Sequence, residues 1–296
     1  MHLNPLKCII NQTHKIFFPF CLRSIRVKNS IFYMVVLLMA VGLKYHYSHA
    51  RSDDLGWILG PTAGVVEYLS GIAFEKEDGA GFVNRANRII IAPSCAGVNF
   101  LIIAFCMAAF SGLHHLKSSG LKIFWLGNSA VWAYVLTIAV NAFRIVASIY
   151  MYKADIYYHG LTPEKLHRIE GIFIYFFFLC MFYVALDKII CFCTRNPEPE
   201  QKKRFRQHSD SMGSGHAAVI PLFWYLLICL GIPFLNRAYH KNGPQFMEHC
   251  LVILSVCMVV FLIVFLIQSG CGWIWGKVQF YLKSVTVGGS TVKDRF

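Results

Sequence analysis

The chain of 296 residues has the length of roughly two soluble domains. Its composition excludes that reading, because 56% of the residues are hydrophobic and only 15% are charged, whereas a soluble chain carries about 25% charged residues. The same figures exclude an intrinsically disordered chain, a coiled coil and a secreted disulfide scaffold. The net charge of +13 is concentrated in short stretches between long apolar runs, and this distribution is typical of a polytopic membrane protein.

Six apolar segments reach the length of about 20 residues that a membrane-spanning helix needs. In chain order they are 30–48, 96–113, 123–149, 169–193, 218–236 and 247–268. The predicted fold class is therefore an all-α, polytopic membrane helical bundle. It has about six transmembrane helices and one further re-entrant or interfacial segment.

That further segment runs from Leu55 to Phe74, and its apolar character is interrupted. It contains Gly56, Gly60, Pro61, Gly64 and Glu67. If it crossed the membrane, the basic loops would no longer fall on one side. We therefore predict that it does not span.

The Lys and Arg residues between the spans predict the orientation, because loops rich in these residues stay in the cytoplasm. Basic residues precede the first span, follow the second and the fourth, and lie beyond the sixth. Both termini are then cytoplasmic, and the connections 49–95, 150–168 and 237–246 lie on the outer face. No zinc-finger spacing, aromatic RNA-binding motif or basic helix is present. The positive charge therefore indicates how the chain is oriented in the lipid bilayer, and it predicts no nucleic-acid partner.

The chain is predicted to have four parts. Residues 1–29 form a cytoplasmic N-terminal segment and residues 30–193 a membrane core. Residues 194–217 form a basic cytoplasmic linker, and residues 218–296 a C-terminal two-helix membrane extension.

Cys95 differs in its surroundings from the other ten cysteines, most of which lie inside apolar runs and behave as small hydrophobes. Pro93 and Ser94 are typical of a helix start, so Cys95 is expected near a helix N-terminus, where free N–H groups favour a thiolate. Gly97 leaves room beside the sulfur. The alternative is a small residue at a helix end with no chemical role.

Arg144 lies 21 residues beyond Ile123 in the third span, which is about 32 Å along a helix. It is then near the outer membrane boundary, level with Cys95. Asn141 lies three residues earlier and shares its face. A charged residue in an apolar helix is a functional hypothesis by default, while the alternative is an arginine that extends to the lipid headgroups.

His167 follows Thr162, Pro163 and Glu164, which together are typical of a helix start. The fourth span is thus expected to present His167 on the outer face in its first turns. Imidazole suits proton transfer near neutral pH, and Glu170, about one turn on, could orient it. The alternative is a solvated interfacial histidine.

Three motifs around these residues resemble, in order and spacing, the signatures of the exosortase/archaeosortase family. They are Cys-Ala-Gly-Val-Asn-Phe (95–100), Asn-Ala-Phe-Arg-Ile (141–145) and His-Arg-Ile-Glu-Gly (167–171). The first motif looks most like the exosortase K type. The resemblance covers about residues 30–193 and leaves the last hundred residues outside it.

The resemblance implies a cysteine transpeptidase with its site on the outer face of the bacterial inner membrane. Its partners would be exported proteins that end in a sorting motif, a transmembrane helix and a basic tail, and an acceptor nucleophile that the sequence does not identify. Cys95 would form a thioester, Arg144 would stabilise the thiolate or the oxyanion, and His167 would be the general acid and base. The supporting residues would be Gly97, Asn99, Asn141 and Glu170. Some relatives have Arg in place of this His.

No Cys-x-x-Cys, His-Glu-x-x-His or P-loop motif occurs, so no metal or cofactor is predicted. Two non-enzymatic alternatives stay open. One is a transporter or channel in which Arg144 contacts an anion, and the other is an assembly subunit of an envelope-polysaccharide system.

Overall fold

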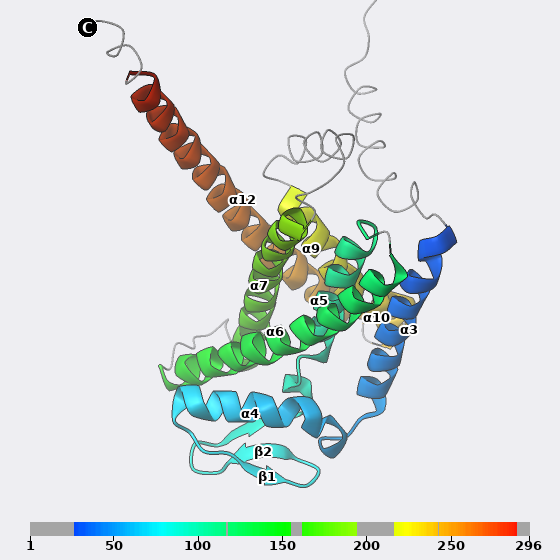
Figure 1. Cartoon of the computed structure of the whole chain (residues 1–296). Coiled ribbons are helices and arrows are strands. Elements are labelled where there is room, and N and C mark those ends of the chain that lie inside the picture. Colours follow the sequence, from blue (N-terminus) through cyan, green and yellow to red (C-terminus); the bar gives the residue numbers. More distant parts are fainter. Residues whose placement is uncertain (1–26, 117, 155–161, 194–215, 242, 289–296) are drawn as a thin grey trace, which may run out of the picture.

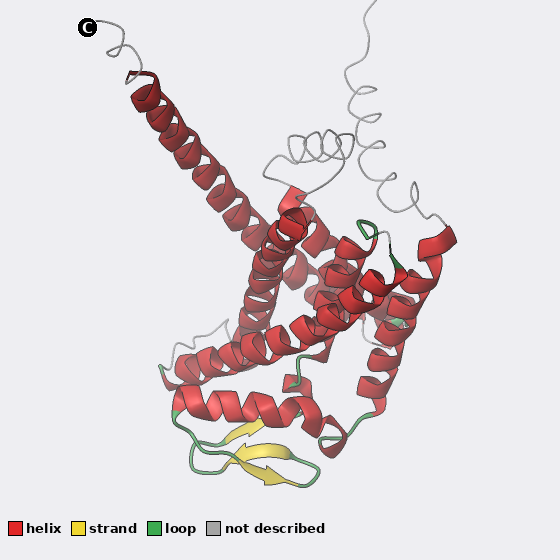
Figure 2. Ribbon diagram, in the orientation of Figure 1, coloured by secondary structure: helices red, strands yellow, loops and turns green. Residues whose placement is uncertain are grey.

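The computed structural model describes residues 27–116, 118–154, 162–193, 216–241 and 243–288. The predicted N-terminal segment 1–29 and the linker 194–217 therefore lie almost wholly outside the described residues. The long helices are α3 (Val27–His49), α4 (Gly56–Ser70), α5 (Val98–Leu113), α6 (Ser119–Lys153), α7 (Pro163–Cys193), α9 (His216–Leu226) and α12 (Gly243–Gly288). Helices dominate the described chain (Figure 2).

The predicted membrane helices are confirmed. Within the described residues, six helical stretches are long and apolar enough to span a bilayer. They are Asn29–His49, Pro93–Leu113, Ser119–Lys153, Lys165–Ile190, Ala218–Leu235 and Gly243–Ile267. The protein is a multi-pass helical membrane protein of the predicted class.

The fifth of these spans is not a continuous α-helix. After α9 it passes through a π-helical turn, η3 (Leu227–Gly231), into α10 (Ile232–Leu235), and a short α11 (Ala238–Lys241) precedes α12. Pro221 lies inside α9 and a second proline follows Ile232. Because proline lacks the N–H of a helix interior, these residues account for the irregular course of this span.

Helix α5 forms the centre of the core. It packs against α3, α6, α7 and α9, and nearly all of its side chains are buried. A helix that is apolar on every face belongs inside a bundle. Small residues such as Ala104, Ala108 and Gly112 allow the neighbouring helices to approach closely.

Helix α4 occupies the segment predicted not to span. Its 15 residues are too few to cross the hydrocarbon core, which needs about 20. It packs against α6 on one side and against β2 (Gly81–Asn84) on the other, so that it lies between the bundle and a small sheet (Figure 1). Glycine at the αL position Gly71 ends the helix.

The small sheet was not predicted from the sequence. It consists of β1 (Glu75–Glu77), β2 and β3 (Ile89–Ile91), joined antiparallel in the order β1-β2-β3. Gly81 pairs with Glu77 at φ +114°, and a Cβ there would overlap the carbonyl oxygen of Ile91. The strand β3 leads directly into a 3₁₀ turn, η2 (Pro93–Cys95).

The C-terminal extension packs on the core through α9, which contacts α5 and α7, and through α12. Helix α12 packs against α7, and Glu248 near its start accepts a hydrogen bond from Arg168 at 3.0 Å. Lys165 lies 3.8 Å from the same carboxylate. These ion pairs lie at the beginning of α7, next to His167.

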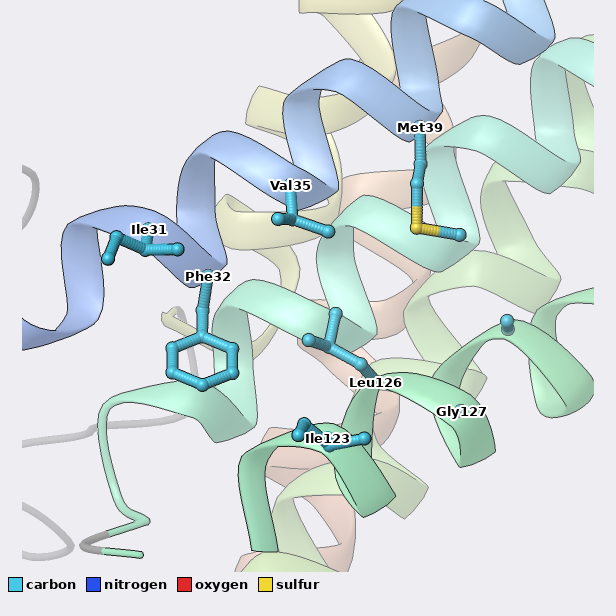
Figure 3. Close-up of a pocket in the computed structure, with 8 residues that line it drawn as sticks. Ile31, Phe32, Val35, Met39, Ile123, Leu126 and Gly127 are labelled. Carbon is cyan, nitrogen blue, oxygen red and sulfur yellow. The ribbon is translucent and has the colours of Figure 1, made fainter. Parts of the chain in front are cut away.

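An open apolar groove lies between α3 and α6 (Figure 3). Its lining is Ile31, Phe32, Val35 and Met39 from α3, and Ile123, Leu126, Gly127 and Ala130 from α6. None of these side chains carries a charge or a nucleophile, so the groove offers no chemistry of its own.

The contact between α5 and α6 generates a prediction about stability. A Cβ added at Gly112 would overlap the indole ring of Trp125, which donates a hydrogen bond to the carbonyl of Ala108 at 3.0 Å. Overpacking of a well-packed core destabilises by about 1–3 kcal/mol. We therefore expect Gly112→Ala to lower the thermal unfolding midpoint of the detergent-solubilised protein.

The control for this prediction is Gly127→Ala on α6, where an added Cβ meets nothing within 4 Å. This variant is expected to unfold at the temperature of the unsubstituted protein. Equal midpoints for the two variants would contradict the close packing of α5 on Trp125.

Candidate active site

Cys95 lies where the chain enters the bundle from the sheet. It is the last residue of η2, and α5 begins at Val98 after Gly97 in the left-handed region at φ +69°. The sequence analysis placed Cys95 at or near the helix N-terminus. The structure places it three residues before the helix, on a separate short turn.

The backbone around Cys95 is fixed by hydrogen bonds and close packing. Its N–H donates to the carbonyl of Ala92 at 2.8 Å, and its carbonyl accepts a hydrogen bond from the side-chain amide of Asn141 on α6. At Gly97 an added Cβ would lie 3.2 Å from Thr137 and 3.3 Å from Asn141. Glycine is required there both by its positive φ and by the close approach of α6.

Arg144 extends from α6 into the space between α6 and α7 and is only 7% exposed. Its NH1 lies 3.2 Å from Nε2 of His167, and its guanidinium carbon lies 5.3 Å from the ring centre of Tyr175, within cation–π range. A Cβ at Gly171 would come within 3.4 Å of this side chain. The glycine of the third motif thus leaves room for the arginine of the second.

The Nε and NH2 atoms of Arg144 have no hydrogen-bond partner among the described residues. A guanidinium is a donor only, and in an apolar interior each unpaired donor is unfavourable. The site therefore presents two buried N–H-bearing atoms that could receive an anionic oxygen or a thiolate.

His167 belongs to a hydrogen-bonded chain that joins α6 and α7. Its Nδ1 lies 2.8 Å from Oγ of Ser148, and the Ser148 hydroxyl donates to Oε2 of Glu170. The direct separation between His167 Nδ1 and Glu170 Oε2 is 3.8 Å. From the sequence, Glu170 could orient His167 directly; in the structure Ser148 lies between them.

Tyr175 contacts both Arg144 and Asn141, the residue that holds the backbone of Cys95. Its hydroxyl donates to the side-chain carbonyl of Asn141 at 2.7 Å, and its ring stacks on Phe100 with centroids 4.9 Å apart. Asn141 is fully buried and is satisfied by Tyr175 on one side and by Cys95 on the other. Neither Tyr175 nor Ser148 was predicted from the sequence. Helical spacing places Ser148 on the face of Arg144, four residues on, and Tyr175 on the face of Gly171, but it does not identify their partners on the other helix.

The structure brings the three predicted catalytic side chains together. The thiol of Cys95 interacts with both the imidazole of His167 and the guanidinium of Arg144. Of the six cysteines whose side chains the structure describes, Cys95 is the one with both of these neighbours. The thiols of Cys106 and Cys180, by contrast, are simply buried in the core.

Asn99 lies apart from this cluster. Its side-chain carbonyl accepts a hydrogen bond from Lys44 of α3 at 2.7 Å, so its described partner is on the first span. Tyr47, one turn after Lys44, places its hydroxyl 3.5 Å from the carbonyl of Pro93. Helix α3 thereby contacts the loop that carries Cys95, and Asn99 contributes to that attachment.

Within the described ranges, no group of three or more His, Cys, Asp and Glu side chains is arranged to hold a metal ion. The apolar groove of Figure 3 shares no residue with the cluster around Cys95. The cluster combines a thiol, an imidazole and a guanidinium that interact electrostatically.

Comparison with models of protein families, with curated proteins and with solved structures finds no match to this chain.

Proposed function

We propose that the protein is an exosortase-like cysteine transpeptidase. It would cleave exported proteins near a C-terminal sorting signal and transfer them to an acceptor nucleophile. The observation that carries this proposal is the convergence of Cys95, Arg144 and His167, from three separate elements, on one partly buried site. A nucleophile, a charge stabiliser and an acid/base are the groups that acyl transfer requires.

The first step is activation of the thiol. Because Arg144 can only donate, the contact of its NH1 with His167 requires a lone pair on Nε2. When Arg144 moves from Nε2 toward the sulfur, the freed lone pair accepts the proton of the Cys95 thiol. The imidazolium that forms has no lone pair to offer, so Arg144 stays with the thiolate.

The second step is acylation. The thiolate attacks the scissile carbonyl carbon, and the negative charge on the resulting oxyanion lies against the donors of Arg144. Collapse of this intermediate breaks the C–N bond, and His167 returns its proton to the leaving amine. The products are a Cys95 thioester and a free C-terminal fragment.

The third step is transfer. His167, neutral again, takes a proton from the entering nucleophile as that group attacks the thioester. Cys95 leaves as a thiolate and is reprotonated by His167. The acceptor receives the acyl group, and the enzyme returns to its starting state.

The cleavage reaction provides the first test. Cys95→Ala should abolish processing of a sorting-signal substrate co-expressed with the protein, as seen by its mobility on a gel, while the variant still inserts into the membrane. Cys250→Ala on α12 is the matched control, because that cysteine is also partly exposed and lies outside the site. Normal processing by Cys95→Ala would exclude the proposal.

Arg144 provides the second test. Arg144→Lys keeps the charge but loses the planar arrangement of donors, and removal of a stabilising donor from an oxyanion costs about 10²–10³ in kcat. We expect a fall of that size in the rate of substrate cleavage, with KM little changed. Arg85→Lys, at an exposed arginine in the turn after β2, is the control and should have no effect. A wild-type rate for Arg144→Lys would remove Arg144 from the mechanism.

The proposed location is the bacterial inner membrane, with the site on the outer face and both termini in the cytoplasm. Asp78 lies in the turn between β1 and β2, on the same connection as Cys95, and Ser118 precedes α6 in the loop at the opposite end of α5. A membrane-impermeant maleimide added to intact cells should add one label to Asp78→Cys and none to Ser118→Cys, as counted by mass. The reverse pattern would invert the orientation.

One observation also favours a transporter that binds an anion, namely the pair of unpartnered donor atoms on buried Arg144. Such a protein would depend on Arg144 and tolerate the loss of Cys95. The Cys95→Ala experiment therefore separates the two functions.

A further inference from the structure

We propose that Ser148 is a positioning residue that holds His167 in the tautomer required for accepting the thiol proton. The proposal rests on the function proposed above. It assigns a role to a side chain that the sequence motifs leave out, and it changes the role of Glu170 from a direct partner of His167 to an indirect one.

The hydrogen bonds that run from Arg144 through His167 and Ser148 to Glu170 determine which atom carries each proton. At one end Arg144 is a donor only, so Nε2 of His167 must be the acceptor. At the other end the carboxylate of Glu170 is an acceptor only, so the Ser148 hydroxyl donates to it. The proton between His167 and Ser148 must then reside on Nδ1, which donates to Oγ at 2.8 Å.

Four other hydroxyls inside described helices bond differently from Ser148. Ser111, Ser70, Thr62 and Thr137 each donate to the carbonyl of the residue four positions earlier, at 2.6–2.8 Å, which is the common arrangement for a hydroxyl inside a helix. Ser148 donates across to α7. A hydroxyl that leaves its own helix for a histidine and a carboxylate has a specific function at that position.

Placing Ser148 between the two groups also suits the reaction. When Nε2 takes the thiol proton, the positive charge on the ring is stabilised through Ser148 by Glu170, whose side chain is only 8% exposed. Glu170 itself lies 3.8 Å from Nδ1, beyond hydrogen-bonding distance. Without the hydroxyl, the imidazole loses its one acceptor for Nδ1–H among the described contacts, and only the contact of Arg144 with Nε2 still favours this tautomer.

The test compares variants that differ by one hydroxyl. Loss of a group that orients a catalytic imidazole is expected to lower kcat for substrate cleavage about 10- to 100-fold in Ser148→Ala, with little change in KM. Ser148→Thr should recover most of the rate, and Ser148→Val, which has the shape of threonine without its hydroxyl, should not. If Ser148→Ala does not fold, the Thr and Val pair decides the question.

A double-mutant cycle separates positioning from a merely structural role. In a His167→Ala background, Ser148→Ala should cause no further loss, because the side chain that it positions is already absent. A further loss of equal size would contradict the proposal. Ser111→Ala, which removes a helix hydroxyl bonded to its own helix, is the control and should keep the wild-type rate.

A substrate-free measurement distinguishes failure of this proposal from failure of the proposed function. Iodoacetamide alkylation of Cys95 in the purified protein, followed by mass spectrometry of its peptide, reports thiolate formation directly. We expect His167→Ala and Ser148→Ala both to slow alkylation several-fold. Slower alkylation in His167→Ala alone would exclude the role of Ser148, and unchanged alkylation in both would exclude His167 as the base.

Discussion

The guanidinium of Arg144 sets the conditions that the neighbouring helices must meet. A charge moved from water into an apolar bundle loses several kcal/mol of hydration unless protein groups replace it. Here His167 accepts one N–H, Tyr175 offers its ring face, and Gly171 leaves the room that the side chain needs. All three residues belong to α7, so they can act on Arg144 only if α7 approaches α6 closely. The same approach brings His167 and Ser148 within hydrogen-bonding distance.

The cysteine depends on this arrangement through Asn141. That buried amide uses its donor on the Cys95 carbonyl and its acceptor on the Tyr175 hydroxyl, so the position of Cys95 is tied to the residue that covers the arginine. Gly97 permits the contact, since a larger residue would press on Thr137 and Asn141. The site is thus one connected network in which backbone, amide, phenol and guanidinium support each other.

The sequence predicted those features that depend on long apolar runs and on costly charges. Six spans follow from hydropathy, and Arg144 stands out because it interrupts such a run. The small sheet escaped prediction because β1 is Glu-Lys-Glu and each strand has only three or four residues, too few for an alternating pattern to emerge. Ser148 and Tyr175 escaped because serine and aromatic residues are ordinary in a membrane helix. Their partners come from a different helix, and pairing between helices cannot be read from one sequence.

The ion pairs of Glu248 with Arg168 and Lys165 connect the C-terminal extension to the turn of α7 that carries His167. Partly exposed pairs of this kind contribute only about 0–1 kcal/mol to folding. Their importance is that they align the start of α12 with the start of α7. Arg168 is the residue next to His167, and its carboxylate partner is supplied by α12. A chimera that exchanges residues 218–296 for another pair of membrane helices must therefore bring an acid to the place of Glu248. Without such an acid, Arg168 and Lys165 in the first turns of α7 would lose the carboxylate that α12 supplies.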